Sequence, residues 1–161
     1  MNVIKLLAHS PSTVAHWTGV GTAHYRSLLL PKRLRELTIL YCAARFRSSY
    51  EWDHHVVVSA DLVSDAERAV IKSAAESGGK GLFGQGEGKK PFTEREGALL
   101  QFLEEVTAGP TVRDELWGEM RRAFCEREIV EVLSLQVSVP GGGKGNVKED
   151  LAYMNGRDSI T

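Results

Sequence analysis

Residues 30–67 read LPKRLRELTILYCAARFRSSYEWDHHVVVSADLVSDAE, and this stretch decides the fold class. Its first part, residues 32–46, places apolar side chains around most of a helix, which is typical of a helix that is mostly buried. A second helix is expected to begin near Tyr50, after two serines that favour a helix start. Ser64 and Glu67 have the spacing of a capping box and therefore predict the start of a third helix.

Helical patterns continue on both sides of this stretch. Before it, we expect a short helix over residues 2–8 and a longer one from Ser10 to about Leu29, with a proline in its first turn. After it, we expect helices over 64–77, 93–108, 111–124 and 126–137. Strand-like alternation is absent from the pattern, so the sequence predicts an all-α fold in a single domain spanning residues 1–161.

Two segments lack a helical pattern. Residues 78–90 are rich in glycine, which predicts a flexible surface loop. Their glycine spacing differs from that of a phosphate-binding loop, which needs four residues between glycines and then Lys followed by Ser or Thr. Residues 138–161 carry several glycines and few large apolar side chains. We therefore expect an atypical, loose tail there, with one short helix over residues 148–154.

The composition limits the kinds of partner that we expect this protein to bind. The net charge is -1, so there is no basic excess to neutralise nucleic-acid phosphates. No apolar stretch reaches the roughly 18 residues of a membrane span, and the apolar part of the N-terminus is too short for a signal peptide. Cys42 and Cys125 each lie in an apolar helical pattern, which predicts two buried thiols in a reducing compartment. We expect a cytoplasmic protein that binds neither nucleic acid nor a membrane.

Glu51 and His55 are the most suggestive pair of chemical groups. They are four residues apart, so on a helix they share one face. A carboxylate beside an imidazole fixes the tautomer of the ring and favours its protonated form, which suits a general acid or base. The same spacing also occurs in ordinary surface contacts.

Glu36 lies inside the apolar pattern of residues 32–46. Arg33 and Arg35 are close in sequence, so Glu36 can be an ordinary solvated carboxylate. If it points inward instead, it needs a partner, because an unpaired buried carboxylate is costly. An adjacent helix carrying His55 can supply that partner.

A metal site is not expected. Glu51 and His54 match half of the Glu-x-x-His motif of di-iron helical bundles, but none of the other histidines outside this segment follows a glutamate by three residues. A zinc site needs three or four converging ligands, which adjacent residues on one helix cannot provide. A redox dithiol is also absent, because the chain has no Cys-x-x-Cys. We expect no metal and no cofactor.

The quoted stretch resembles the core of the carboxymuconolactone decarboxylase family, whose members share L-P-x-R-L-R-E-L-x-I-L followed by Y-E-W-x-x-H. The superfamily also includes the alkyl hydroperoxidase D proteins. The match is close over residues 29–70 and looser over 93–109 and 116–135. The resemblance implies an alkyl hydroperoxidase D-like helical bundle. It also implies a homotrimer or homohexamer, with a site between helices near a subunit interface.

The resemblance also assigns positions within that site. In the peroxidase branch a glutamate is followed by Cys-x-x-Cys and then a histidine. Here the glutamate position corresponds to Glu36, the two cysteine positions to Ser48 and Glu51, and the histidine position to His55. With both thiols absent, the resemblance implies the decarboxylase branch, in which His55 is the acid/base and Glu36 and Glu51 are its partners.

The expected function is that of a cofactor-free lyase or isomerase. His55 would transfer a proton on a small carboxylate, lactone or aromatic ketide bound by Tyr50, Trp52, Arg45 and Ser48. Two alternatives stay open. The atypical tail is compatible with a catalytically silent oligomeric binding protein, and Cys42 or Cys125 with a residual oxidoreductase.

Overall fold

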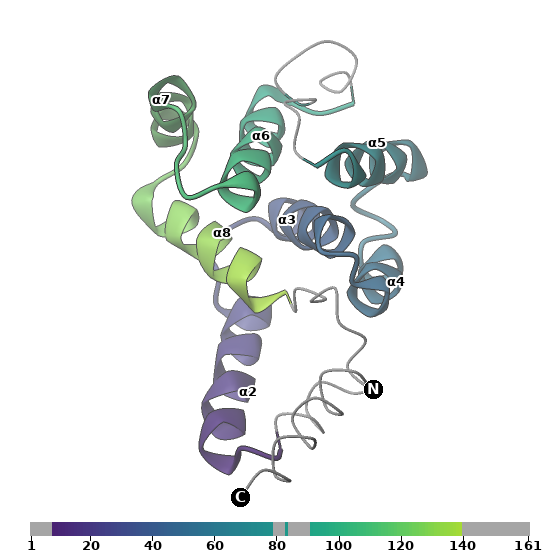
Figure 1. Cartoon of the computed structure of the whole chain (residues 1–161), viewed down its shortest axis with the longest axis vertical. Coiled ribbons are helices and arrows are strands. Elements are labelled where there is room, and N and C mark those ends of the chain that lie inside the picture. Colours follow the sequence, from purple (N-terminus) through teal and green to yellow (C-terminus); the bar gives the residue numbers. More distant parts are fainter. Residues whose placement is uncertain (1–7, 79–82, 84–90, 140–161) are drawn as a thin grey trace, which may run out of the picture.

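The computed structural model describes residues 8–78, 83 and 91–139. Within these ranges the chain forms seven helices and no strand (Figure 1). The helices are α2 (Pro11–Arg26), α3 (Lys32–Arg45), α4 (Ser49–Val58), α5 (Asp65–Glu76), α6 (Glu94–Ala108), α7 (Asp114–Ala123) and α8 (Glu126–Ser138). The expected all-α class is confirmed for this part of the chain. The helix expected over residues 2–8, most of the 78–90 loop and nearly all of the 138–161 tail lie outside the described residues.

Helix α3 forms the centre of the molecule. Every residue from 34 to 44 is buried, including Glu36. The helix packs against α4, α5, α6 and α8, which lie around it in Figure 1. A helix that is buried on all sides belongs to the core rather than to the surface, as its sequence pattern predicts.

Two expected helix boundaries are wrong by a few residues. Helix α2 ends at Arg26 rather than near Leu29, because the chain beyond it is held by another element. The Glu131 carboxylate of α8 accepts hydrogen bonds from the backbone N–H groups of Leu29 (3.1 Å) and Leu30 (2.9 Å). These long-range bonds use N–H groups that a longer helix would have used internally.

Helix α7 likewise begins at Asp114 rather than near Thr111. The Glu105 carboxylate of α6 accepts hydrogen bonds from the backbone N–H (2.9 Å) and the guanidinium (2.7 Å) of Arg113. Arg113 therefore becomes the N-cap residue of α7. This partner is eight residues away, beyond the reach of a local capping rule.

Arg33 ties α3 to the start of two other helices. Both expected capping boxes are present, with Glu67 closing onto Ser64 at α5 and Glu96 closing onto Thr93 at α6. The Arg33 guanidinium contacts Glu67 Oε1 and Glu96 Oε1, each at 2.5 Å. One cation thus joins the N-termini of α5 and α6 to the central helix, and each carboxylate serves both a cap and an ion pair.

This junction predicts acid sensitivity. Burial raises the pKa values of Glu67 and Glu96, but the hydrogen bonds from Arg33 and from the cap residues lower them by more, so both pKa values lie below the ordinary range. Carboxyl groups whose pKa values are lowered by folding stabilise the folded protein at pH values above their pKa in the unfolded chain. This stabilisation is lost as the pH falls through their pKa in the folded protein. The urea midpoint should therefore fall between about pH 7 and about pH 3. The fall should be smaller in Arg33→Met, and an equal fall in both proteins would contradict the assignment.

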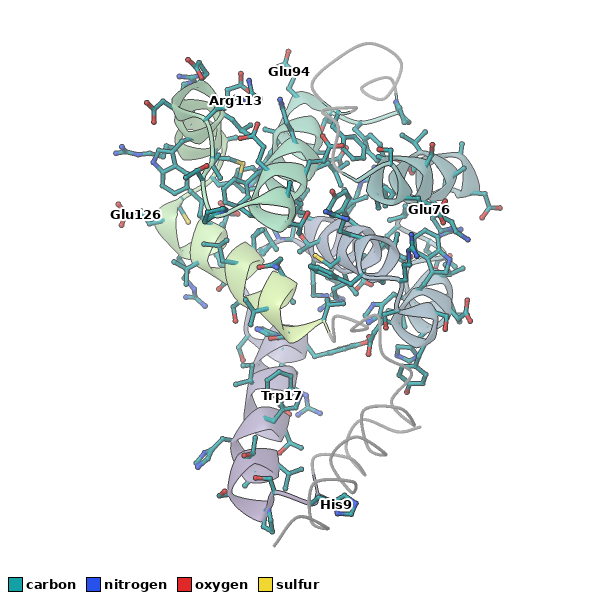
Figure 2. The ribbon with its side chains drawn as sticks, viewed as in Figure 1. His9, Trp17, Glu76, Glu94, Arg113 and Glu126 are labelled. Atoms are coloured by element: carbon teal, nitrogen blue, oxygen red, sulfur yellow. The ribbon has the colours of Figure 1, made fainter. Side chains whose placement is uncertain are left out.

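Helix α2 extends away from the other helices in Figure 1 and packs on α8. Its only buried residue is His24, whereas the apolar side chains of Val20 and Tyr25 are exposed. Figure 2 shows side chains filling the space among α3 to α8, while α2, on which Trp17 is labelled, projects beyond them.

The expectation of two buried thiols is half wrong. Cys42 is fully buried in α3, but Cys125 is exposed. Cys125 lies between α7 and α8 as the N-cap residue of α8, and its backbone N–H donates to Glu128 (3.0 Å). A helix boundary places this residue at the surface, whereas the apolar pattern around it suggested one continuous buried segment.

Candidate functional site

A tight turn brings the candidate residues of α3 and α4 together. Arg47 adopts a φ of 59°, the left-handed conformation that is uncommon for a residue with a side chain. The Ser48 N–H donates to the carbonyl of Ala43 (2.8 Å) and the Arg47 N–H to that of Ala44 (3.2 Å), which closes the end of α3. The chain then reverses, and α4 packs against α3.

The Glu36 carboxylate is the buried centre of the site. Its side chain is 0% exposed, and its Oε2 lies 2.7 Å from Nδ1 of His55. Its other oxygen, Oε1, accepts from the Arg35 guanidinium at 2.9 Å. Burial raises the pKa of Glu36, but the hydrogen bond and charge of His55, followed by those of Arg35, lower it by more, so the net pKa lies below its ordinary value.

The ionised state of Glu36 fixes the tautomer of His55. A carboxylate can only accept a hydrogen bond, so Nδ1 of His55 must carry a proton and donate it to Glu36. In the neutral ring this leaves the lone pair on Nε2. A buried carboxylate that orients an imidazole through Nδ1 is the arrangement that prepares Nε2 as a general base.

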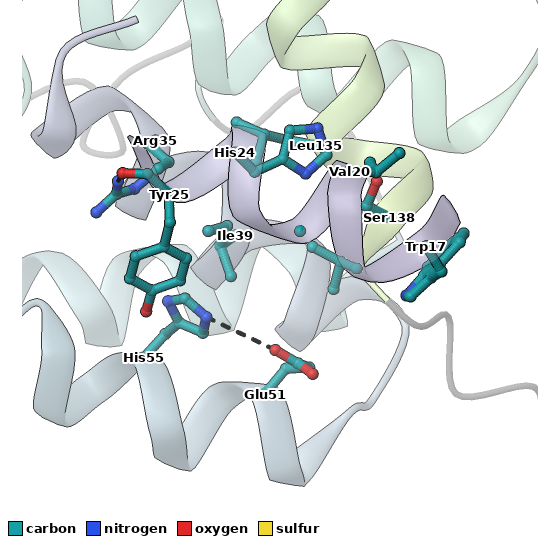
Figure 3. A pocket seen from close by; sticks show the side chains of 12 residues that line it. Trp17, Val20, His24, Tyr25, Arg35, Ile39, Glu51, His55, Leu135 and Ser138 are labelled. Atoms are coloured by element: carbon teal, nitrogen blue, oxygen red, sulfur yellow. Dashed lines mark hydrogen bonds and ion pairs between the residues drawn. The ribbon is translucent and has the colours of Figure 1, made fainter. Parts of the chain in front are cut away.

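Glu51 lies on the other side of the imidazole. Its Oε2 is 3.6 Å from His55 Nε2, which is too long for a direct hydrogen bond (Figure 3). The two groups lie one turn apart on α4, as their spacing predicts. If Nε2 takes up a proton, the resulting imidazolium lies between two carboxylates, and both stabilise its charge.

A cavity of about 150 Å³ lies beside His55 and Glu51, with walls from α2, α3, α4 and α8 (Figure 3). Its apolar lining consists of Trp17, Val20, Gly21, Ile39, Leu135 and Val139. Its polar lining consists of His24, Tyr25, Arg35, Glu51, His55 and Ser138. A mostly apolar hollow with a few convergent polar groups is the usual form of a small-molecule site.

His24 adds a neutral group to this wall. Its Nε2 lies 2.8 Å from the Ser134 hydroxyl of α8. Burial lowers the pKa of His24, and the negative charge of Glu131 opposes this only in part. The ring is therefore uncharged near neutral pH, so it adds no positive charge to the cavity.

The structure brings Glu36, Glu51 and His55 together, as the sequence suggested. None of the four expected substrate-binding residues lines the cavity beside them. Tyr50 is exposed and stacks on His54, and Arg45 donates to the carbonyl of Thr107 (3.4 Å).

Ser48 and Trp52 line a different cavity, of about 190 Å³, together with Lys72 and Glu76. Helix geometry explains this separation. Residue 52 is rotated by about 100° from residue 51 on α4, so it faces α5 rather than the His55 cavity. The substrate-binding role of these residues stays a prediction.

Sequence reasoning missed the contributions of α2 and α8. His24 and Tyr25 approach the site only because α2 packs on α8. No local sequence pattern predicts that contact. The sequence placed Arg35 beside Glu36 only as a neighbour that could make Glu36 a solvated carboxylate, whereas in the structure both side chains are buried and paired. Ser138 belongs to the last turn of α8, where the sequence suggested the start of a loose tail.

Among the residues that the structure describes, no cluster of three or more His, Cys, Asp or Glu side chains is placed to hold a metal ion. None of the described helices combines the length and apolar character needed to cross a membrane.

No protein-family model, curated protein or solved structure matches the chain.

Proposed function

We propose that this protein is a cofactor-free acid/base enzyme, a lyase or isomerase, in which His55 transfers a proton on a small carbonyl compound. The observation that carries the proposal is the 2.7 Å hydrogen bond between His55 Nδ1 and the buried Glu36 carboxylate, beside a cavity. This bond leaves His55 Nε2 as the proton acceptor. Perturbed, buried ionisable groups that converge on a cavity are typical of catalytic sites.

The first chemical step follows from this geometry. His55 Nε2 takes a proton from the carbon next to the carbonyl, and the electron pair of the broken C–H bond moves onto the carbonyl oxygen as an enolate. Glu36 and Glu51 stabilise the imidazolium that forms. An isomerase returns the proton to another carbon. A decarboxylase reaches the same enolate by loss of carbon dioxide and then uses the imidazolium to protonate it.

Exchange of substrate protons with solvent tests this function. We would incubate a panel of small ketones, keto acids and lactones with the protein in deuterated water and follow the loss of C–H signals by NMR. At least one compound should exchange faster with the protein than with the His55→Gln variant, since glutamine cannot accept the proton. Exchange at the rate of buffer alone for the whole panel would contradict the proposal.

We also propose membership of the carboxymuconolactone decarboxylase-like superfamily, with an alkyl hydroperoxidase D-like bundle assembled as a homotrimer or homohexamer. The support is the resemblance of residues 29–70 and the Glu36–His55 pair. The exposed apolar side chains of α2 provide a surface for a second copy. Light scattering at micromolar concentration should report a multiple of the 17.7 kDa chain mass. A monomer would contradict this part of the proposal.

The oxidoreductase alternative is weaker on chemical grounds. Burial raises the pKa of the Cys42 thiol to about 12, so little of the reactive thiolate forms near neutral pH. Neither Cys42 nor Cys125 lines the cavity beside His55. A silent binding protein remains the main competitor, and the exchange experiment separates it from an enzyme.

A further inference from the structure

The charges that face the cavity are poorly suited to an anionic ligand. Arg35 is the only cationic side chain, apart from the histidines, among the described residues of the lining. Its guanidinium already contacts Glu36 at 2.9 Å and donates to the backbone carbonyl of Tyr25 at 3.2 Å. Its guanidinium carbon lies over the Tyr25 ring, 4.9 Å from the ring centroid. The charge of Arg35 is therefore already paired with that of Glu36.

Glu51 adds a negative charge to the same cavity, and His24 is neutral. A substrate carboxylate bound here would lose its water without gaining an unused cation, and it would face Glu51. Both effects oppose its binding. An uncharged ligand meets neither penalty.

The cavity has room and apolar walls for a small ring. Its volume is about 150 Å³. An apolar protein cavity of roughly this volume can hold a benzene molecule. The apolar side chains of Ile39 and Leu135 lie opposite the ionisable groups of α4, so one side of a ring can contact carbon while the other side faces His55.

Tyr25 is the polar group best placed to hold the oxygen of such a ligand. It lines the cavity, and Figure 3 shows its phenol pointing toward His55. Burial raises the pKa of Tyr25, as do the charges of Glu36 and Glu51, while Arg35 lowers it by less. The phenol therefore stays protonated and can donate. Among the described residues, the backbone carbonyl of Tyr25 accepts from Arg35, and the Tyr25 hydroxyl has no hydrogen-bond partner.

We propose that the cavity binds an uncharged, enolisable carbonyl compound about the size of one six-membered ring, with its carbonyl oxygen on the Tyr25 phenol. This inference rests on the proposed function and narrows it to isomerisation rather than decarboxylation. The C–H bond breaks, the proton goes to His55 Nε2, and the electron pair moves to the oxygen held by Tyr25. The same proton then returns to a different atom of the substrate. The step needs no oxidant, reductant or second substrate.

Two matched probes test the substrate class. 4-Nitrophenol resembles a neutral enol, and its absorbance reports its ionisation, whereas 4-nitrobenzoate carries a carboxylate on a similar ring. Absorbance and calorimetric titrations are made at a pH below the solution pKa of the phenol. We expect 4-nitrophenol to bind and to ionise on the protein, because His55 takes its proton and Tyr25 holds its oxygen. We expect 4-nitrobenzoate to bind at least about tenfold more weakly, since Arg35 is already paired with Glu36 and the charge of Glu51 faces the cavity.

Tyr25→Phe keeps the ring under Arg35 and removes only the hydroxyl. This substitution should weaken the binding of 4-nitrophenol by about tenfold or more, which is the usual effect of losing a hydrogen bond to a charged oxygen. The affinity for 4-nitrobenzoate should be unchanged. Thr22→Val is the control, because it also removes one hydroxyl from α2. Thr22 is exposed, its hydroxyl donates to the carbonyl of Thr18 at 2.9 Å, and it lies outside the cavity lining, so both affinities should be unchanged.

The outcomes separate this inference from the function on which it rests. If 4-nitrophenol ionises on the protein but Tyr25→Phe binds it equally well, or if 4-nitrobenzoate binds as tightly, the substrate class is wrong and His55 remains the base. If 4-nitrophenol binds without ionising, His55 does not accept its proton, and the proposed function fails. If neither probe binds, the substrate class is also overturned.

Discussion

Replacing His55 with alanine is expected to slow proton transfer by about 10²–10⁴-fold, which is the usual contribution of a positioned general acid or base. The reason is that Nε2 is the atom left free to accept a proton once Glu36 holds Nδ1 at 2.7 Å. The rate of solvent exchange into a responsive compound measures the effect. His55→Gln should show a similar loss while retaining a side-chain donor for Glu36, so a loss in both variants separates chemistry from folding.

His54→Ala is the matched control. The two histidines are adjacent on α4, but His54 is rotated by about 100° on the helix and stacks on the exposed Tyr50. Its removal should change the exchange rate far less. Equal losses at His54 and His55, or no loss at either, would place the reacting group elsewhere.

Replacing Glu36 with alanine is expected to cause the largest loss of stability. Glu36 is fully buried and accepts from both Arg35 and His55. Removing one member of a buried ion pair leaves its partners without compensation and typically costs about 3–5 kcal/mol. Urea denaturation followed by circular dichroism measures the change in the free energy of unfolding.

Glu51→Ala is the control for this prediction. Glu51 is also a partner of His55, but its contact is longer, at 3.6 Å, and its side chain is 16% exposed. We expect a loss of at most about 1 kcal/mol, because partly solvated ion pairs contribute little. A comparable loss in the two variants would show that the burial of Glu36 has no special role.

The effect of replacing Glu36 on stability is expected to change with pH. The pKa of Glu36 lies below its ordinary value in the folded protein. Its contribution to stability is therefore complete above the pKa of the unfolded chain and is lost as the pH falls through the folded pKa. The gap between the wild type and Glu36→Gln should narrow in acid. A gap that widens there would contradict the assignment of an ionised Glu36.

The sequence predicted what depends on local pattern. The apolar positions of residues 32–46 identified the central helix, and the spacing of Ser64 with Glu67 and of Thr93 with Glu96 located two helix starts. The Glu51–His55 contact also follows from helical spacing alone. In each case the determining interactions lie within one or two turns of a single helix.

The remaining features depend on contacts between distant segments. The pairing of Glu36 with His55 required the turn at Arg47, whose left-handed backbone no sequence rule predicted. The end of α2 depends on Glu131, roughly one hundred residues away. The role of Tyr25 depends on the packing of α2 near the cavity. Such features follow from tertiary structure and override local propensity.

The most direct test of the account concerns the protons on the His55 ring. Nitrogen-15 chemical shifts of labelled histidine distinguish a protonated from an unprotonated ring nitrogen, and the signals lost in His55→Gln assign this residue among the five histidines. At a pH where the ring is neutral, we expect its proton on Nδ1 and the lone pair on Nε2, because an ionised Glu36 can only accept, and a smaller share of this tautomer in Glu36→Gln. At that pH, a proton on Nε2, or a tautomer unaffected by Glu36→Gln, would contradict the pairing of His55 with an ionised Glu36.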